Sequence, residues 1–515
     1  MGLLRMFERS VDLYGDKTAL IYESQKINYS ALDALSGHYA DFLLARGVKQ
    51  GDNLLILSHN SINCVAVILS CLKTGCVACP VNWRMSPIEL AGLLKRQSFV
   101  AALCDCQGAA LLRSAADLRA IPLNQYRMDE IAKAFGAAVP RQHVREEPGD
   151  RIALQLFTSG STGEPKVIRH SSGGLSEYIY NYALESRWTD DDIYETSANL
   201  FHLSGVSILT SLMIGGTAVI FHHFDLKEFL ITMKREKCTR VSLVPTLVSR
   251  LLNADEPCAQ YFTSVKKIVY GGSPMNLATV EQAMEQFGCG LEQAYGTTET
   301  GCIAILSGED HERCSRGMID RRILFSAGRP LPNVNIRIKE EPEYIEDGMP
   351  CCGEIEVNSP FLYAESLIGA TCRKCADYHA TGDIGYFDED GYLYLIGRKN
   401  DMIISGGENI YPKEVENCIS ELKQDVAEVC VLGIPDEDWG ERVVACIVRK
   451  EGSSLTEKQV IEYCKAHIAH YKKPRSVFFM DTLPENANGK IARGKLRKCL
   501  YEGMPFCIET PERKC

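Results

Sequence analysis

The stretch that most constrains this chain of 515 residues is a loop rich in glycine and hydroxyl side chains. An apolar run at residues 152–157 precedes the loop and predicts a buried strand, and another short run follows at residues 166–170. Glycines accept positive φ angles, which lets backbone N–H groups turn toward one point. The sequence therefore predicts a loop that holds a polyanion, with phosphate as the first candidate. The loop comprises Thr158, Ser159, Gly160, Ser161, Thr162, Gly163 and Lys166.

The loop alone leaves two interpretations open, a phosphate site and an ordinary turn. It does not end in the Gly-Lys-Ser/Thr of the Walker A sequence, and Ser/Thr/Gly clusters are also typical of solvated turns. Three later stretches bear on this choice. They are Gln-Ala-Tyr-Gly-Thr-Thr-Glu-Thr at residues 293–300, Thr-Gly-Asp-Ile-Gly-Tyr at residues 381–386 with Gly397 and Arg398, and Asn-Gly-Lys at residues 488–490.

Composition and charge exclude several classes of protein. With 45% apolar and 24% charged residues, the chain has the composition of an ordinary globular protein of two or more domains. A net charge of −11 argues against a nucleic-acid partner held by a basic surface. No run is long enough for a transmembrane helix, and the N-terminus lacks an apolar secretory core. The scattered 22 cysteines fit reduced thiols, so we expect a cytoplasmic protein.

A cluster formed by Cys372, Cys375 and His379 is the sharpest candidate for a metal site among the cysteines. A structural metal site needs four convergent ligands, and no second pair stands at a suitable spacing. The sequence favours a cysteine-tolerant surface segment here.

Alternating strands and helices dominate the first part of the chain. Ser30 is the predicted N-cap of a helix that ends near Gly47, residues 53–58 and 99–104 predict strands, and residues 62–73 predict a helix. Such alternation predicts an α/β fold, with parallel sheets covered by helices on both faces. Further helices are predicted at residues 176–186, 206–213 and 277–287.

From about residue 317 to Arg398, short strands separated by turns predict a β-rich subdomain. The remaining residues predict a small α+β unit. We therefore divide the chain into residues 1–399, a large domain with the nucleotide and acyl sites, and residues 400–515, a small C-terminal domain.

In their order along the chain, the four motifs resemble the signature motifs of the adenylate-forming superfamily, which comprises acyl-CoA synthetases, adenylation domains and luciferases. The resemblance runs from about residue 16 to residue 497. It implies a small domain that is mobile about a hinge after Arg398. Asn400 stands at the hinge position, where these enzymes usually carry Asp or Lys. A hinge requires only backbone freedom, so Asn400 changes at most its kinetics.

The resemblance implies a role for each nucleotide-site residue. Residues 158–166 would hold the β- and γ-phosphates of ATP, Glu299 would bind Mg²⁺, and Thr298 would contact the α-phosphate. Tyr295 would stack on adenine, and Asp383 with Arg398 would hold the ribose. Lys490 would bridge the acid's carboxylate and the α-phosphate during adenylation only. The backbone around the base would come from Gly271, Gly272, Ser273, Gln293, Ala294, Gly296 and Thr297.

Each of these residues also has a simpler interpretation. A Thr-Thr-Glu run is often the N-cap of a helix, Asp383 between two glycines can merely shape a turn, and Lys490 by itself is an ordinary loop lysine. Their joint occurrence favours the nucleotide site.

The acid half of the site is only outlined. His202 lies in a Phe-His-Leu-Ser-Gly segment that resembles acyl- and aryl-CoA synthetases, whereas amino-acid-activating domains usually carry Asp in its place. We expect a carboxylic acid that lacks an α-amino group, in a pocket suited to an alkyl or aryl tail. The predicted pocket residues are His202, Gly205, Val206, Thr246, Tyr270 and Gly296.

After adenylation, the family's small domain rotates and brings a glycine loop to the site for thiol attack; here that loop is Gly406, Gly407 and Glu408. Lys472, Lys473 and Arg475 are candidates for the phosphates of coenzyme A, although the sequence around them favours an ordinary solvated basic turn. We expect an AMP-forming acid–CoA ligase that uses ATP, Mg²⁺ and coenzyme A. The alternative is a stand-alone adenylating enzyme that loads an acyl carrier protein. An inactive descendant is a further alternative, but it has no chemical reason to keep all the motif residues.

Overall fold

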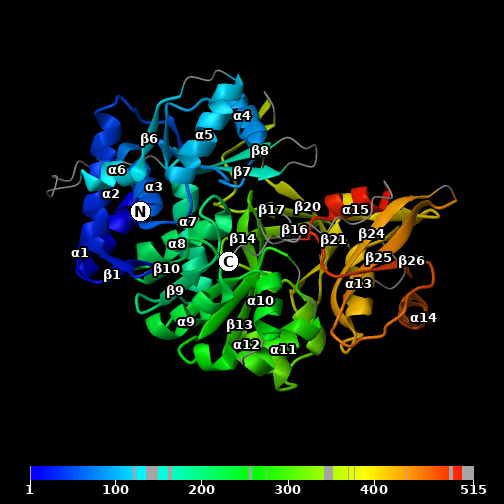
Figure 1. The fold of residues 1–515 in the computed structure, drawn as a ribbon. Coiled ribbons are helices and arrows are strands. Elements are labelled where there is room, and N and C mark those ends of the chain that lie inside the picture. Colours follow the sequence, from blue (N-terminus) through cyan, green and yellow to red (C-terminus); the bar gives the residue numbers. More distant parts are fainter. Residues whose placement is uncertain are drawn as a thin grey trace.

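A computed structural model provides the structure of the protein (Figure 1). It describes residues 2–119, 123–134, 149–159, 165–254, 258–273, 275, 277–340, 352–368, 371–375, 377–436, 438–485 and 491–501. No helix among these residues is both long and apolar enough to cross a membrane.

Two large, mainly parallel sheets form the main body. In the described part of the chain, the first sheet has nine strands in the order β15-β14-β13-β12-β11-β9-β10-β1-β2, and the second has eight in the order β19-β18-β8-β7-β4-β3-β5-β6. The first consists of β1 (Thr18–Tyr22), β2 (Gln25–Asn28), β9 (Ile193–Thr196), β10 (Thr217–Ile220), β11 (Arg240–Leu243), β12 (Lys267–Gly271), β13 (Gly290–Thr297), β14 (Gly301–Leu306) and β15 (Arg329–Pro330). The second consists of β3 (Asn53–Leu57), β4 (Val77–Pro80), β5 (Ala101–Cys104), β6 (Gln125–Arg127), β7 (Ile152–Ser159), β8 (Pro165–Ser171), β18 (Glu365–Ile368) and β19 (Thr371–Lys374).

Strands β10, β9, β11, β12 and β13 run parallel, and antiparallel strands lie at both edges of their sheet. The second sheet likewise combines parallel strands with antiparallel β8, β18 and β19. The apolar runs predicted as buried strands are indeed buried, because helices cover both faces of each sheet. The predicted α/β fold with parallel sheets is confirmed.

Helices form the layers around these sheets. One core cluster lies between the two sheets and takes side chains from both, and separate clusters cover their outer faces. The helices of the main body are α1 (Leu3–Tyr14), α2 (Tyr29–Leu44), α3 (Ile62–Thr74), α4 (Pro87–Arg96), α5 (Cys106–Arg119), α6 (Met128–Lys133), α7 (Ser172–Glu185), α8 (Leu203–Ile214), α9 (Leu226–Glu236), α10 (Pro245–Leu252), α11 (Leu277–Phe287) and α12 (Gly308–Ser315), with 3-10 turns η1 (Cys258–Tyr261) and η2 (Arg321–Phe325).

Capping residues explain where several helices begin, and they correct two predictions. Helix α2 is capped by Asn28, whose side chain accepts from the N–H of Ala31, so the predicted N-cap Ser30 lies inside the helix. Helix α7 begins four residues before the predicted start, because Ser171 caps it by accepting from Gly174. Helix α11 covers the residues predicted for it.

Two further sheets complete the described part of the chain. Strands β16 (Asn335–Glu340), β17 (Gly353–Asn358), β20 (His379–Phe387) and β21 (Leu393–Arg398) form the predicted β-rich subdomain. The C-terminal sheet, at the right of Figure 1, follows the turn η4 (Lys399–Asp401). It contains β22 (Ile403–Ser405), β23 (Glu408–Ile410), β24 (Val426–Asp436), β25 (Gly440–Arg449) and β26 (Ser476–Met480), with helices α13 (Pro412–Ser420), α14 (Glu457–His467) and α15 (Arg493–Tyr501). The predicted division at residues 399 and 400 falls within η4 and stays a prediction.

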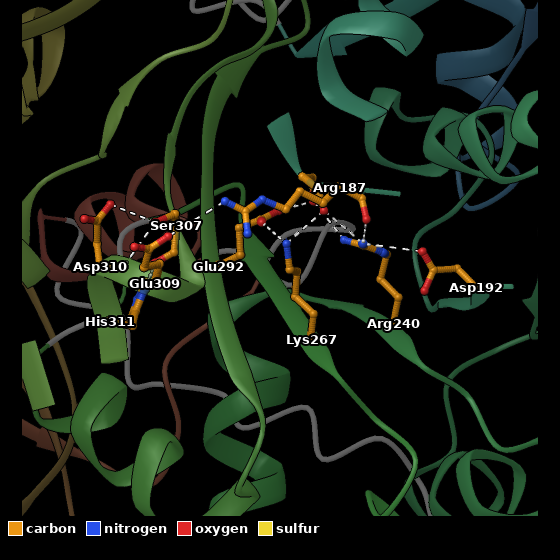
Figure 2. Close-up of polar contacts among 10 residues, drawn as sticks. Arg187, Asp192, Arg240, Lys267, Glu292, Ser307, Glu309, Asp310 and His311 are labelled. Carbon is orange, nitrogen blue, oxygen red and sulfur yellow. Dashed lines mark hydrogen bonds and ion pairs between the residues drawn. The ribbon is translucent and has the colours of Figure 1, made fainter. Parts of the chain in front are cut away.

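A buried ionic network links the end of α7 to the nine-stranded sheet (Figure 2). The guanidinium of Arg240 donates to the hydroxyl of Ser186 at 2.8 Å and lies 3.5 Å from Asp192. Ser186 in turn donates to Glu292, which pairs with Lys267. Because each buried charge has an opposite partner, removing one member leaves an uncompensated charge and destabilises the fold strongly.

Glu195 is a buried acid without such a partner. It lies in the middle of the nine-stranded sheet with 0% exposure, between Val219 and Val241 on the adjacent strands. Ser197 donates to one carboxyl oxygen at 2.8 Å, and the other oxygen finds no hydrogen-bond partner among the described residues. Burial raises the pKa of Glu195 to about 8.

We expect Glu195 to make the stability of the protein depend on pH. Because folding raises its pKa from 4.5 to about 8, the folded state holds this proton more tightly. The stabilisation from this proton is complete below about pH 4.5 and is lost as the pH rises toward 8; the total loss over this range is a few kcal/mol. Thermal unfolding midpoints between pH 5 and pH 8.5 should therefore fall less steeply for Glu195→Gln than for the wild type.

The matched control is Glu389→Gln, which changes an exposed carboxylate in a turn. Equal pH slopes for Glu195→Gln and the wild type would contradict the assignment of this proton to Glu195.

Candidate functional site

An ion pair joins the two residues predicted for the phosphate and metal end of the site. The Nζ of Lys166, on β8, lies 2.8 Å from Oε1 of Glu299, in the turn between β13 and β14. Burial alone would raise the pKa of Glu299, but the charge and hydrogen bond of Lys166 outweigh it and hold the pKa below the usual value. Glu299 is therefore ionised, as a hard ligand for a divalent cation must be.

The Thr-Thr-Glu run is not a helix N-cap. Residues 297–301 form the turn of an antiparallel hairpin, and the hydroxyl of Thr300 accepts from the N–H of Thr297 at 3.0 Å. Gly301 has φ of 66°, and a Cβ there would meet the ring of Phe361 at 2.3 Å. The hairpin thus projects Glu299 at the end of β13, which decides against the simpler interpretation of the run.

A second charged pair forms the predicted ribose end. Asp383, on β20, accepts from the hydroxyl of Tyr295 at 2.8 Å and pairs with Arg398 of β21 at 3.0 Å. Asp383 is buried at 7% exposure, whereas the Arg398 side chain is 60% exposed. The ring of Tyr295 is 9% exposed, so adenine stacking on it stays a prediction.

Strand β13 brings the two ends together. It carries Tyr295, bound to Asp383, and it leads directly into the turn with Thr298 and Glu299. Close backbone packing at this strand requires glycine at two positions. A Cβ on Gly296 would lie 1.7 Å from the carbonyl oxygen of Gly301, and one on Gly271 would lie 2.4 Å from that of Ala294.

Three of the six predicted acid-binding residues lie at the start of α8. His202 is the N-cap residue, with its ring 4.3 Å from that of Phe201, and Val206 is buried within the first turns. Gly205 is required there, because a Cβ would meet the carbonyl oxygen of Asn199 at 2.2 Å. Thr246 lies in the first turn of α10 and is half-buried.

Tyr270 departs from its predicted role in the acid pocket. Its side chain is 1% exposed and packs in the core cluster on the outer face of the nine-stranded sheet. Its hydroxyl contacts Gln293 at 3.2 Å and His311 at 2.9 Å. The side chain therefore packs in the core and contacts Gln293 of β13. The sequence did not show this, because His311 lies 41 residues away on α12.

The predicted glycine loop lies in the turn between β22 and β23. Gly406 and Gly407 have φ of 64° and 84°, and both are exposed together with Glu408. Beside Gly406 lies Trp439, a residue that motif analysis missed: it is 41% exposed, and the guanidinium of Arg475 stands 3.5 Å over its ring.

One of the three basic residues predicted for the acceptor is not available. Lys472 is 6% exposed and pairs with Glu414 at 3.0 Å, so Glu414 already neutralises its charge within the small unit. This corrects the prediction for Lys472, while Lys473 and Arg475 stay candidates.

Five predicted site residues lie outside the described residues: Gly160, Ser161, Thr162, Gly163 and Lys490. For Ser159 only the backbone, at the end of β7, is described. Glu485 is the last described residue before Lys490. Glu485, five residues before it, lies 3.2 Å from Arg250, one turn beyond Thr246 on α10. Glu485 thus contacts α10, the helix that carries Thr246.

Two residues near the phosphate end were also missed. The N–H of Tyr363 donates to the carbonyl of Glu299 at 3.0 Å, and the Nζ of Lys166 lies 5.9 Å from the Tyr363 ring. His379 packs edge-on against that ring at 5.1 Å. Burial lowers the pKa of His379, which also senses the charges of Glu299 and Lys166. Only the fold brings these segments together.

Comparisons with known proteins agree with this geometry. Residues 7–365 match the family described as AMP-binding enzyme, and residues 414–490 match the AMP-binding enzyme C-terminal domain. The chain is 31% identical to an indoleacetate–CoA ligase of Aromatoleum aromaticum, covering 97% of this chain and 98% of the relative. It is also 31% identical to a fatty acid–[acyl-carrier-protein] ligase of Streptomyces coeruleorubidus, covering 93% of this chain and 92% of the relative.

A solved structure provides an independent comparison. The o-succinylbenzoate CoA synthetase of Bacillus subtilis, in complex with its acyl-adenylate intermediate, superimposes with a TM-score of 0.82 at 30% identity. The superposition covers 96% of this chain and 97% of that one. The fold and the sequence similarity thus extend over nearly the full length.

The chain therefore belongs to the AMP-binding enzyme family, within the acyl-CoA synthetase group of the adenylate-forming superfamily. It is an enzyme that binds ATP and AMP.

We expect Glu299→Gln to weaken the metal-dependent part of ATP binding by about tenfold, because an amide is a poorer ligand for a hard cation than a carboxylate. The measurement is the dissociation constant of ATP by calorimetry, with and without Mg²⁺, which needs no knowledge of the acid. Asp383→Asn is the matched control: it should weaken ATP binding by a similar factor under both conditions. An unchanged Mg²⁺ effect in Glu299→Gln would remove Glu299 from the metal site.

Proposed function

We propose that this enzyme joins a carboxylic acid without an α-amino group to the thiol of coenzyme A, through an acyl-adenylate. The observation that carries the proposal is the pairing of two charged ends along β13. Lys166 and Glu299 suit a polyphosphate with its cation, and Asp383 with Arg398 suits a ribose. A nucleoside triphosphate matches both ends, and the family match agrees.

The first half-reaction makes a mixed anhydride. A carboxylate oxygen of the acid bonds to the α-phosphorus of ATP, the bond to the bridging oxygen breaks, and pyrophosphate leaves with the electron pair. Lys166 compensates charge on the leaving phosphates, and Thr298 donates to the α-phosphate. Mg²⁺ held by Glu299 would offset further charge; no group of three or more acidic, His or Cys side chains able to hold a metal occurs among the described residues, so phosphate and water oxygens would complete its shell.

The acid is a fatty or an aromatic acid. His202 stands where a carboxylate would be needed to bind an α-ammonium group, and the N-terminal part of α8 around it is apolar. The relatives named above act on indoleacetate, o-succinylbenzoate and fatty acids. Two of these three acids carry an aromatic ring, which makes aryl acids the first to test.

The second half-reaction transfers the acyl group to a thiol. The sulfur bonds to the acyl carbon, AMP leaves, and the thiol proton is released. The exposed loop contains Gly406 and Gly407, which have no side chains. The thiol-bearing chain of the acceptor can therefore approach the backbone of this loop closely. Nearby, the exposed Trp439 ring and the Arg475 guanidinium suit the base and phosphates of coenzyme A.

Rotation of the small domain between the half-reactions belongs to this proposal. One ion pair, Arg250–Glu485 at 3.2 Å, joins α10 of the main body to the small unit. A second pair, Glu281–Lys423 at 2.9 Å, joins α11 to the small unit. Both pairs must break when the domain turns, and exposed pairs of this kind resist such a motion only weakly.

The second candidate function is the loading of an acyl carrier protein. The similarity to a fatty acid–[acyl-carrier-protein] ligase favours it. Both functions share the adenylation step and differ only in the acceptor. The Trp439–Arg475 pair favours coenzyme A, because a carrier protein brings no adenine to stack on an exposed indole.

The proposal is tested by incubating the protein with MgATP, coenzyme A and a panel of acids, with products identified by mass spectrometry. The panel contains indoleacetate, 2-succinylbenzoate, benzoates, cinnamates, and fatty acids from short to long. We expect a strong acyl-CoA product from one class. Acyl-adenylate without acyl-CoA would favour the carrier-protein function, and no adenylate from any acid would contradict both.

Lys490→Ala should separate the two half-reactions of whichever acid is found. We expect adenylate formation, measured by pyrophosphate exchange, to fall about a hundredfold, because a cation at the reacting oxygens is lost. Thioester formation from preformed acyl-adenylate should keep its wild-type rate. An equal loss in both half-reactions would contradict the role assigned to Lys490.

A further inference from the structure

The loop at residues 197–202, between β9 and α8, ends at the predicted acid-binding residue His202 and is held from two sides. Its first half is bound to the strand it leaves, because the hydroxyl of Ser197 donates to Glu195 of β9 at 2.8 Å. The second anchor comes from the other large sheet. The loop therefore lies where the two sheets of the main body are joined.

The second anchor is Asn60, which follows β3 of the eight-stranded sheet. Its amide nitrogen donates to the carbonyl oxygen of Ala198 at 3.0 Å, and its amide oxygen accepts from the N–H of Leu200 at 3.0 Å. A carbonyl can only accept and an N–H can only donate, so the two partners fix the orientation of the amide. Asn60 thus binds alternate residues of the loop as a residue of a neighbouring strand would.

The contact between Asn60 and the loop is buried. Asn60 is 4% exposed and Leu200 is 3% exposed. Bulk water is therefore kept from the N–H of Leu200, and a buried donor that loses its acceptor destabilises the conformation it belongs to. Without the Asn60 amide, the backbone of the loop would have to change its course to find other partners.

The position of Asn60 is itself fixed by the eight-stranded sheet. Asp105, the residue after β5, accepts from the backbone N–H of His59 at 2.9 Å, and its carboxylate lies 2.7 Å from Nδ1 of the same residue. Burial alone would raise the pKa of Asp105, but the hydrogen bonds from His59 and from the N–H of Gly108 outweigh it and lower the pKa to about 2. The carboxylate therefore stays an acceptor and holds the turn that carries Asn60.

We propose that Asn60 is a positioning residue for the acid substrate. By tying residues 198–200 to the eight-stranded sheet, it fixes the backbone from which Phe201 and His202 face the acid. The proposal rests on the acid-binding role of His202 in the proposed function. A loop that is already ordered avoids the loss of conformational entropy that ordering it on binding would require. The residues proposed for ATP lie on other segments, so the anchor acts on acid binding alone.

Steady-state kinetics with the acid that the panel identifies test the proposal. In Asn60→Ala, we expect KM for the acid to rise about tenfold or more, because the loop loses its tie to the eight-stranded sheet. KM for ATP should stay within about twofold of the wild-type value. Asn60→Asp keeps an acceptor for Leu200 but sets a carboxylate oxygen against the carbonyl of Ala198, so it should raise KM for the acid as well.

The matched control is His59→Leu, at the residue next to Asn60. The imidazole is 4% exposed and packs against the rings of Trp83 and His222, with ring centres 3.8 and 4.3 Å away. The substitution removes these contacts and the bond from the ring to Asp105, but it keeps the backbone bond to Asp105 and the Asn60 amide. It should lower the unfolding midpoint and leave KM for the acid at its wild-type value.

Hydrogen exchange provides a readout that needs no acid. Peptides that cover residues 198–203 should exchange faster in Asn60→Ala than in the wild type, and His59→Leu should keep the wild-type rate there. If the wild type activates no acid, the proposed function fails and this readout still decides whether Asn60 holds the loop. Unchanged exchange in Asn60→Ala would overturn the proposal, and so would an unchanged KM for the acid, an equal rise in KM for ATP, or the same rise in His59→Leu.

Discussion

The site depends on one strand, β13, that is held from three directions. Through Gln293 it contacts Tyr270 on the neighbouring parallel strand, and through Tyr295 it reaches Asp383 in the four-stranded sheet. Its turn carries Glu299 to Lys166, which belongs to the eight-stranded sheet. Three separately built sheets thus meet at the carboxyl end of one strand, where open α/β sheets generally bind their ligands.

The charges at this meeting point neutralise one another. Lys166 pairs with Glu299, and Arg398 pairs with Asp383, so each group predicted to bind a part of the nucleotide already has an opposite partner. Buried charges require such partners, since an isolated one is costly in a medium of low polarity. A ligand that carries both negative phosphates and a cation can replace these contacts pair by pair, which makes MgATP a better match than either component alone.

The buried polar side chains that support the site differ from the ion pairs within it, because no ligand can replace their protein partners. His311 and Tyr270 are buried and hydrogen-bonded to each other, and the network of Arg240, Glu292 and Lys267 is closed on itself. Buried polar groups that are bonded to fixed partners hold one another in one geometry. The site can therefore exchange its own ion pairs for ligand contacts while the strands that carry them keep their positions.

The sequence by itself determined the element types, the α/β class and the family, because strand periodicity, glycine turns and motif order are local properties. It also determined that Lys166, Glu299, Asp383 and Arg398 are the charged groups to consider. Only the tertiary structure decided which of them meet, that the Thr-Thr-Glu run is a hairpin turn, and that Asn28 rather than Ser30 caps α2. It alone placed the Tyr270 side chain in a core cluster, in contact with Gln293 and His311, and paired Trp439 with Arg475. The physical reason is that these contacts join residues far apart in the chain, and their geometry is set by how the sheets pack rather than by any local pattern.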